Sequence, residues 1–192
     1  MIEKPGLLVV ISGPSGVGKD TLIERLRELD PMLSYSISYA TRKPRPGEKD
    51  GVNYFFASRQ KFEELIAQGF FLEYATYNGN YYGTPAAAVD EALAGGRDIL
   101  LKIEVQGAAQ VRKRAPGALF IFIAPPSTEE LVRRQELREG AARDEDMAER
   151  LKIAETEMEH AAEYDHVVVN DDLGRAVAEV LEIIRRAREG QT

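Results

Sequence analysis

Four short runs of apolar residues are separated by longer segments in which apolar positions recur with a helical period. A strand buried on both faces of a parallel sheet gives a continuous apolar run, whereas a surface helix keeps one polar face. The runs lie at residues 7–11, 99–105, 119–124 and 166–169. Their alternation with helical segments predicts an α/β fold, with a parallel sheet flanked by helices.

Local signals indicate where several helices begin. An amphipathic segment over residues 21–29 follows the first apolar run, and a last helix is expected over residues 173–188. Thr84 followed by Pro85 is typical of an N-cap and a first helical position. Residues 127–130, with the sequence STEE, predict a capping box at the start of another helix.

Two regions depart from this alternation. Residues 37–86 are rich in tyrosine, glycine and arginine and contain an Asn78-Gly79 turn, while residues 127–150 are rich in arginine. We interpret the first region as an inserted substrate-binding subdomain and the second as a mobile lid. Both would belong to a single domain whose core comprises residues 1–36, 87–126 and 151–192.

Composition excludes several classes of function. The chain has 192 residues, 44% hydrophobic and 30% charged, and its net charge of −7 argues against general nucleic-acid binding. The absence of cysteine excludes disulfides, thiolate metal sites and a cysteine nucleophile. No apolar run approaches the ~20 residues of a membrane helix, and the N-terminus lacks a signal-peptide pattern. We therefore expect a cytoplasmic protein without nucleic-acid or membrane partners, either a monomer or a small homo-oligomer.

A glycine-rich stretch joins the first apolar run to the first predicted helix. It meets seven of the eight places of the phosphate-loop pattern Gly-x-x-x-x-Gly-Lys-Ser/Thr. Glycines let consecutive backbone N–H groups converge, the helix N-terminus adds the positive end of its dipole, and Lys19 adds a full charge. The expected ligand is the phosphate chain of a nucleoside triphosphate. The residues expected to bind it are Gly13, Pro14, Ser15, Gly16, Val17, Gly18, Lys19, Asp20 and Thr21.

Other candidate residues are ambiguous when taken alone. Residues 36–47 combine two arginines with hydroxyls on a proline-stiffened loop, which fits either a phosphate site or a solvated basic loop. Glu73 lies in an apolar run, so it is either exposed or a deliberate acceptor. Lys102 and Glu104 would share one face near the C-terminal end of a strand, where open α/β sheets bind ligands.

Six segments together resemble the guanylate kinase family, in its order and at its spacings. The resemblance extends from about residue 6 to residue 188, which makes it far more specific than any one motif. The segments are GPSGVGK at 13–19, TRKPR at 41–45, GVNYFF at 51–56, NYYGTP at 80–85, EVQG at 104–107 and PPS at 125–127.

The resemblance implies a fold and a reaction. The fold would be that of P-loop NTPases, with an inserted subdomain for the nucleoside monophosphate and a helical lid. The reaction would be magnesium-dependent transfer of the γ-phosphoryl group of ATP to GMP or dGMP, in purine nucleotide metabolism. It implies that the GMP phosphate is held by Ser38, Arg42, Arg45, Tyr54 and Tyr82, and that the guanine is held by Glu73, Thr84 and Glu104.

The resemblance also assigns residues to ATP and to catalysis. Asn170 would lie near the adenine. The cations expected to act on the transferred phosphoryl group are Lys19, Arg42, Arg134, Arg138 and Arg150. Phosphoryl transfer needs mainly positioning and charge stabilisation, so arginines that close from a lid fit this role.

Two positions depart from the family pattern. Asp20 replaces the hydroxyl that ligates magnesium, and Lys102 replaces an acidic residue of the family. In one hypothesis Asp20 ligates magnesium directly or through water, while Lys102 offsets the added charge or contacts a phosphate. In the other, Asp20 and Lys102 pair with each other and magnesium is held mostly by phosphates and water.

Two other functions are compatible with the sequence. The Gly-Lys-Asp order at Asp20 fits a related P-loop kinase for a ribose bisphosphate, although Glu73 and Glu104 argue against it. A non-catalytic guanylate-kinase-like module that binds a phosphorylated peptide is the second alternative. Lys19 and the lid arginines argue against that module, because such modules have lost their ATP-site residues.

Overall fold

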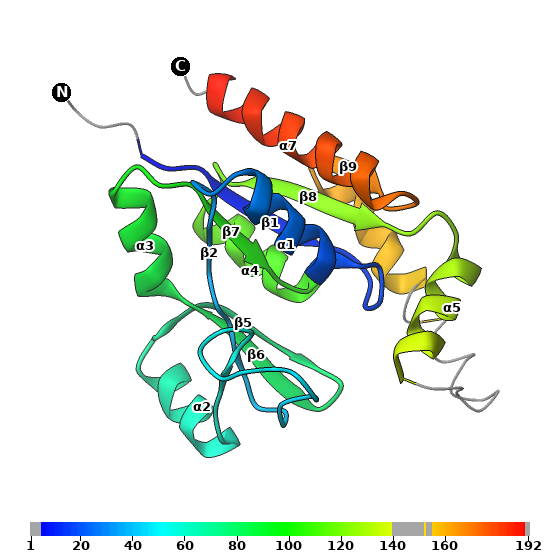
Figure 1. The fold of residues 1–192 in the computed structure, drawn as a ribbon. Coiled ribbons are helices and arrows are strands. Elements are labelled where there is room, and N and C mark those ends of the chain that lie inside the picture. The colour runs from blue at the N-terminus through cyan, green and yellow to red at the C-terminus, as the bar shows by residue number, and fades with distance from the viewer. Residues whose placement is uncertain (1–4, 140–151, 153–154, 191–192) are drawn as a thin grey trace. The chain divides into compact units, whose positions relative to one another are not determined.

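The computed structural model describes residues 5–139, 152 and 155–190 (Figure 1). The chain divides into two compact units, each built from two segments. One comprises Met1–Leu8 and Met32–Ala118, and we call it the tyrosine-rich unit. The other comprises Val9–Pro31 and Leu119–Thr192, and we call it the P-loop unit.

The P-loop unit contains three parallel strands in the order β1-β8-β9, with Val9 opposite Leu119 and Ile121 opposite His166. Strands β1 and β8 are buried along their whole length, which explains their unbroken apolar sequences. Helix α7 lies beside α1 and β9 (Figure 1). The elements are β1 Leu8–Ser12, α1 Lys19–Leu29, β8 Leu119–Ala124, α5 Thr128–Glu139, η1 His160–Glu163, β9 His166–Val169 and α7 Leu173–Gly190.

The tyrosine-rich unit contains a parallel pair, β2 and β7, and a four-stranded sheet in the order β4-β3-β6-β5. An aromatic cluster around Phe62 and Phe71 is its core, and the two rings stack with centroids 4.4 Å apart. The elements are β2 Ser34–Tyr35, β3 Tyr39–Ala40, β4 Phe55–Phe56, α2 Arg59–Ala67, β5 Phe71–Tyr77, β6 Asn80–Pro85, α3 Ala86–Ala94, β7 Ile99–Lys102 and α4 Val105–Arg114.

Strands β5 and β6 form a hairpin closed by the predicted turn. Tyr77 pairs with Asn80, and the two residues between them have positive φ values, 47° at Asn78 and 72° at Gly79. An Asn-Gly pair tolerates this conformation, which matches the twist of the two strands. The hairpin prediction is therefore confirmed.

All four apolar runs form strands, but one of them is shorter than predicted. Strand β7 ends at Lys102 and helix α4 begins at Val105, with Glu104 as its N-cap. The prediction that Lys102 and Glu104 share a strand face is therefore wrong. A short apolar run cannot by itself distinguish a buried strand from the first turn of a buried helix.

Two predictions about helix starts also need correction. Helix α3 begins at Ala86, so Thr84 and Pro85 lie in β6 and the Thr84 hydroxyl bonds to Glu73 instead of capping a helix. The hydroxyl donates to a buried carboxylate oxygen, which is a strong acceptor, whereas an N-cap hydroxyl would accept from a helix N–H. The capping box at α5 is half formed. The Glu130 N–H donates to Ser127 Oγ at 3.2 Å, but the Glu130 carboxylate pairs with arginines.

The limits of the predicted insertion and lid stay predictions. Within the predicted lid, residues 140–150, and with them Arg150, lie outside the described residues. In the part of the chain that the structure describes, no helix combines the length and apolar character needed to cross a membrane.

Candidate functional site

The glycine-rich loop between β1 and α1 has a conformation that only glycine fits. Gly13, Gly16 and Gly18 have φ values of 145°, 92° and 98°. A Cβ on Gly13 would lie 2.2 Å from the carbonyl oxygen of Ile123. Gly18 is also the N-cap of α1, and no side chain caps this helix, so its first N–H groups suit an anionic ligand.

Lys19 folds back over this loop. Its side chain is buried, and Nζ donates to the carbonyl oxygens of Gly13 and, at 3.1 Å, Pro14. A lysine ammonium has three donors and no acceptor, so these carbonyls hold it while a phosphate can approach. The loop therefore fixes its own cation through main-chain oxygens.

Three polar side chains brace the loop. Gln135 Nε2 donates to the Ser15 carbonyl at 2.5 Å, and Asn170 Nδ2 donates to the Val17 carbonyl at 2.8 Å. Arg134 Nη1 donates to the carbonyl of Asn170 at 3.0 Å. Asn170 is buried, so here it braces the loop, and its predicted adenine contact stays a prediction. Gln135 was not identified from the sequence, because nothing distinguishes it from other polar residues of an amphipathic helix.

Arg134 is also fixed by an acid on its own helix. Glu130 Oε1 lies 2.8 Å from Arg134 Nε, and Glu130 Oε2 lies 2.7 Å from Arg133 Nε. Hydrogen bonds from Arg133 and then Arg134 lower the pKa of Glu130 to about 2. Arg134 therefore lies at the loop, and its predicted action on the ATP phosphates stays a prediction, whereas Arg133 pairs with Glu130. Arg138 lies in the last turn of α5.

Asp20 and Thr21 are exposed in the first turn of α1. Their side chains are therefore accessible to a metal–nucleotide complex at the helix N-terminus. No group of three or more His, Cys, Asp or Glu side chains is arranged for a metal ion within residues 5–139, 152 and 155–190.

In the tyrosine-rich unit, Arg42 is held by Glu48 in a two-bond ion pair. Arg42 Nη1 and Nη2 lie 2.5 Å and 2.7 Å from the two Glu48 oxygens. The Glu48 carboxylate raises the pKa of the Arg42 guanidinium, and Arg42 lowers the pKa of Glu48. The backbone N–H of Arg45 donates to the same acid at 2.7 Å. Glu48 was not identified from the sequence, although an acid within an arginine-rich loop is a signal for such a pair.

Two tyrosines lie beside this arginine. Arg42 Cζ is 4.9 Å from the Tyr54 ring centroid, and the Tyr54 and Tyr82 rings are 6.1 Å apart. Burial raises the pKa of the Tyr82 hydroxyl, so this group stays a neutral hydrogen-bond donor. Lys102 Nζ lies 4.8 Å from the Tyr54 centroid. Arg42 and Lys102 therefore both contact the ring of Tyr54, a residue predicted to bind the phosphate of GMP.

Glu73 is a buried acceptor. Its side chain is 3% exposed, and the hydroxyl of Thr84 donates to Oε1 at 2.6 Å. Burial, the largest cause, and the nearby charge of Glu104 together raise the pKa of Glu73 to about 7, against the hydrogen bonds from Thr84. Of the two interpretations left open by the sequence, the exposed one is wrong. Ser38, assigned to the phosphate, is also buried.

Glu104 carries a second buried oxygen next to this acid. Its Oε2 is buried and has no hydrogen-bond partner among the described residues. An unpaired buried carboxylate oxygen is costly, and a ligand that donates N–H groups would satisfy it. Glu73, Thr84 and Glu104 therefore form an acidic cradle suited to a ligand edge that carries several N–H donors.

Tyr81 packs against the aromatic core cluster. Its ring stacks on Phe62, with centroids 5.2 Å apart and an interplanar angle of 15°. The remaining hydroxyl accepts from Arg59 Nη2 at 3.0 Å. Tyr82 is therefore the member of the pair that lies with Arg42.

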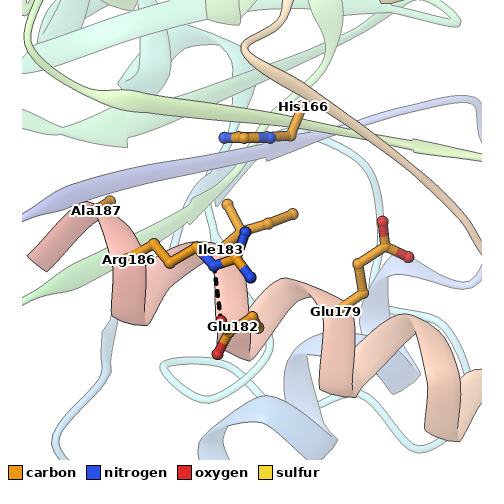
Figure 2. Close-up of a pocket in the computed structure, with 6 residues that line it drawn as sticks. All are labelled: His166, Glu179, Glu182, Ile183, Arg186 and Ala187. Carbon is orange, nitrogen blue, oxygen red and sulfur yellow. Dashed lines mark hydrogen bonds and ion pairs between the residues drawn. The ribbon is translucent and has the colours of Figure 1, made fainter. Parts of the chain in front are cut away.

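A surface pocket lies in the P-loop unit. Its cavity volume is about 510 Å³, and it lies between β9 and the C-terminal half of α7. Figure 2 shows His166 on one side and the ion pair between Glu182 and Arg186, at 2.7 Å, on the other. None of the residues predicted from the sequence to bind a nucleotide lines this pocket.

A glycine loop with an inward lysine, between a buried parallel strand and a helix, defines a P-loop α/β protein. Residues 6–187 match the sequence model of the family described as guanylate kinase. The chain belongs to the guanylate kinase family.

Individual relatives agree over nearly the whole length. The chain is 48% identical to a guanylate kinase of Desulfitobacterium hafniense (strain Y51) over 184 residues, which cover 96% of this chain and 92% of that protein. It is 51% identical to a guanylate kinase of Listeria innocua over 180 residues, 93% of this chain and 87% of that protein. The crystal structure of guanylate kinase from Anaplasma phagocytophilum superposes with a TM-score of 0.82 at 34% identity, covering 97% of this chain and 88% of that one.

Proposed function

We propose that this protein transfers the γ-phosphoryl group of ATP to GMP or dGMP, which gives ADP and the corresponding diphosphate. Its membership of the guanylate kinase family supports this reaction. The observation that carries the proposal is the acidic cradle, in which buried Glu73 lies beside the unpaired Oε2 of Glu104. We further propose that it acts in the cytoplasm, in purine nucleotide metabolism, as a monomer or small homo-oligomer.

The cradle suits guanine and rejects adenine. Guanine presents N1–H and an exocyclic amine on one edge, and an ionised carboxylate accepts from both. Adenine presents an unprotonated N1 at the matching position, where it would face a carboxylate lone pair. Thr84 already occupies one lone pair of Glu73 Oε1 at 2.6 Å, which fixes the orientation of the remaining acceptors.

The cluster around Arg42 would hold the phosphate of the acceptor nucleotide. The guanidinium of Arg42 is already oriented by Glu48, so little conformational freedom is lost when a phosphate binds. Tyr54 and Tyr82 would donate from their hydroxyls, and Ser38 and Arg45 complete the set. The contact of Lys102 with Tyr54 supports the hypothesis that Lys102 contacts a phosphate, and we assign this phosphate to the acceptor.

The glycine loop and its braces would hold ATP. The unsatisfied N–H groups at the start of α1, with Lys19, would bind the β- and γ-phosphates. Arg134 would add charge near the transferred group, and we assign Arg138 and Arg150 to the same task. Asn170 would lie at the adenine end of the site. These residues position two polyanions and stabilise the charge on the group in transit.

Magnesium would enter with ATP. The exposed carboxylate of Asp20 can offer one oxygen, directly or through water, and the phosphates and water would supply the other ligands. Bound there, the ion would neutralise phosphate charge and hold the phosphate oxygens in place. Of the two alternatives to this kinase, the structure favours neither. The buried acids would repel a ribose bisphosphate. A non-catalytic module is not favoured, because Lys19 is held on the glycine loop and Arg134 is bonded to the carbonyl of Asn170.

The test is ADP production from ATP with GMP, dGMP, AMP, CMP or UMP as acceptor, with and without magnesium. Magnesium-dependent turnover with GMP and dGMP, and none above background with the other three, is the expected result. Comparable turnover with AMP, or no turnover with any nucleotide, would overturn the proposal.

A further inference from the structure

One face of helix α4 contacts the strand that carries Glu73. Gly107, Gln110 and Arg114 are spaced by three and four residues, so they lie on one side of the helix. Their contacts are with β5, which is the last strand in the order β4-β3-β6-β5. The outer edge of such a strand leaves backbone groups without a strand partner.

Gln110 takes the place of a strand partner at Tyr74. Its Nε2 donates to the Tyr74 carbonyl at 2.6 Å, and its Oε1 accepts from the Tyr74 N–H at 3.3 Å. The side-chain amide thus satisfies both backbone groups of the residue directly after Glu73, as the peptide of an adjacent strand would.

Arg114 acts on the other side of Glu73. Its Nη1 donates to the carbonyls of Phe71, at 3.0 Å, and Leu72, at 2.5 Å. The pairing between β5 and β6 is irregular at this point, because Phe71 pairs with Pro85 while Glu73 pairs with Thr84. An irregularity of this kind bends a strand and re-aims its side chains, so Arg114 holds the strand where it turns Glu73 inward.

Gly107 brings the helix against the carboxylate itself. A Cβ at this position would lie 2.3 Å from Glu73 Oε2 and 3.0 Å from its Cδ. The absence of a side chain is what lets the helix approach Glu73 so closely.

We propose that Gln110 and Arg114 are positioning residues for substrate specificity, which clamp β5 on both sides of Glu73 and aim its carboxylate at the guanine edge. The inference rests on the proposed function, since it assigns the guanine to Glu73. Neither residue belongs to the set that the family resemblance assigns to GMP.

Arg114 has an electrostatic effect that Gln110 lacks. Three groups face Glu73: the Thr84 hydroxyl from β6, the Glu104 carboxylate at the N-cap of α4, and the Arg114 guanidinium from α4. Burial and Glu104 favour protonated Glu73, while Arg114 favours the ionised form. Removal of the Arg114 charge therefore leaves less ionised Glu73 near pH 7.

The test compares Gln110→Met, Arg114→Ala and Arg114→Lys with the control Lys113→Ala, which removes a charge from an exposed position of the same helix. For each variant, KM is measured for GMP and for ATP, together with kcat and the pH profile of kcat/KM for GMP. Gln110→Met and Arg114→Ala are expected to raise KM for GMP about tenfold, with KM for ATP changed by less than about twofold. Lys113→Ala should match the parent protein.

The pH profile distinguishes an effect of Arg114 on the Glu73 carboxylate from a general contribution of Arg114 to the fold. Arg114→Ala should move the acid limb of kcat/KM to higher pH, Gln110→Met should leave it in place, and Arg114→Lys should restore it. Should Arg114→Ala fail to fold, the KM values of Gln110→Met for GMP and for ATP still test the aiming of Glu73. Unchanged KM for GMP in the folded variants, or an equal rise in KM for GMP and ATP, overturns the inference. Failure of the parent protein to phosphorylate GMP would overturn the proposed function instead.

Discussion

The two units hold their key cations in different ways. In the P-loop unit, Lys19 is held by main-chain carbonyls, on a loop whose shape depends on glycine. In the tyrosine-rich unit, Arg42 is held by the side chain of Glu48. Carbonyl oxygens do not titrate and do not distinguish one nucleobase from another. The arrangement in the P-loop unit therefore suits a phosphate chain. Carboxylates titrate and can distinguish one nucleobase from another. The arrangement in the tyrosine-rich unit therefore suits a particular nucleotide.

The energetic cost of selecting a nucleobase therefore lies in the tyrosine-rich unit. An ionised carboxylate at 3% exposure is unfavourable for folding, and Glu73 is retained there next to a second acid. The P-loop unit offers a phosphate the N–H groups that the first turn of a helix always leaves without an intrahelical partner. Substitutions should therefore separate phosphate chemistry from base selection.

The largest effect is expected from Lys19→Met. It removes the cation from the loop, and we expect kcat to fall roughly 100- to 1,000-fold, as for loss of a preorganised donor to a developing charge. The dissociation constant of GMP, measured by calorimetry without ATP, should stay within about twofold, because Lys19 belongs to the P-loop unit and the proposed GMP residues belong to the tyrosine-rich unit. A comparable loss of GMP binding would break the division between the two units.

Glu73→Gln should reduce kcat/KM for GMP about 100-fold, since charge-assisted hydrogen bonds to the base are lost. Binding of ATP, measured with a non-hydrolysable analogue, should be unchanged. In the parent protein kcat/KM for GMP should also fall below about pH 7, where Glu73 becomes protonated. A flat profile between pH 6 and 8 (roughly one unit either side of that pKa) would contradict the assignment of Glu73 to the base.

The same substitution should stabilise the protein. Folding raises the pKa of Glu73 from 4.5 to about 7, so the protonated form is the one that the fold favours. The stability contributed by this group is full below the unfolded pKa and is lost as pH rises through about 7. Above that pH, Glu73→Gln should add about 1–3 kcal/mol to the free energy of unfolding. Thermal unfolding at pH 5 and pH 8 should show a gain only at the higher pH.

Lys102→Met should have the smallest effect. It removes the second cation at the Tyr54 ring, and a threefold to tenfold rise in KM for GMP is expected, roughly the worth of one partly exposed cation. Lys61→Met, on the exposed side of α2, is the matched control. A rise in KM for ATP with KM for GMP unchanged would move Lys102 from the acceptor nucleotide to the ATP side.

The sequence predicted those features that depend on residues close together in the chain. The buried strands, the glycine loop and the Asn78-Gly79 hairpin follow from residues close together in the chain. The end of β7 and the role of Thr84 did not, because each depends on a partner that only tertiary packing supplies. Glu73 lies eleven residues before Thr84, and their hydrogen bond replaces the cap that the Thr84-Pro85 pair favours locally.

The supporting residues of the site were the least predictable. Glu48, Gln135, Gln110 and Arg114 are polar residues of ordinary types, and their function follows only from which backbone group or cation they meet. Gln110 meets Tyr74 across 36 residues, and no spacing rule connects such positions. Motifs identify groups that touch ligands far better than the groups that aim them.

The clamp of α4 on β5 also has a consequence for biosynthesis. During translation, the hairpin of β5 and β6 leaves the ribosome before Gln110 and Arg114 have emerged. Until then the outer edge of β5 has no cover, and an uncovered edge can pair with other chains. The tyrosine-rich unit therefore completes its folding late, after residue 114 emerges, and the helix that aims Glu73 in the mature protein also shields the nascent one from aggregation.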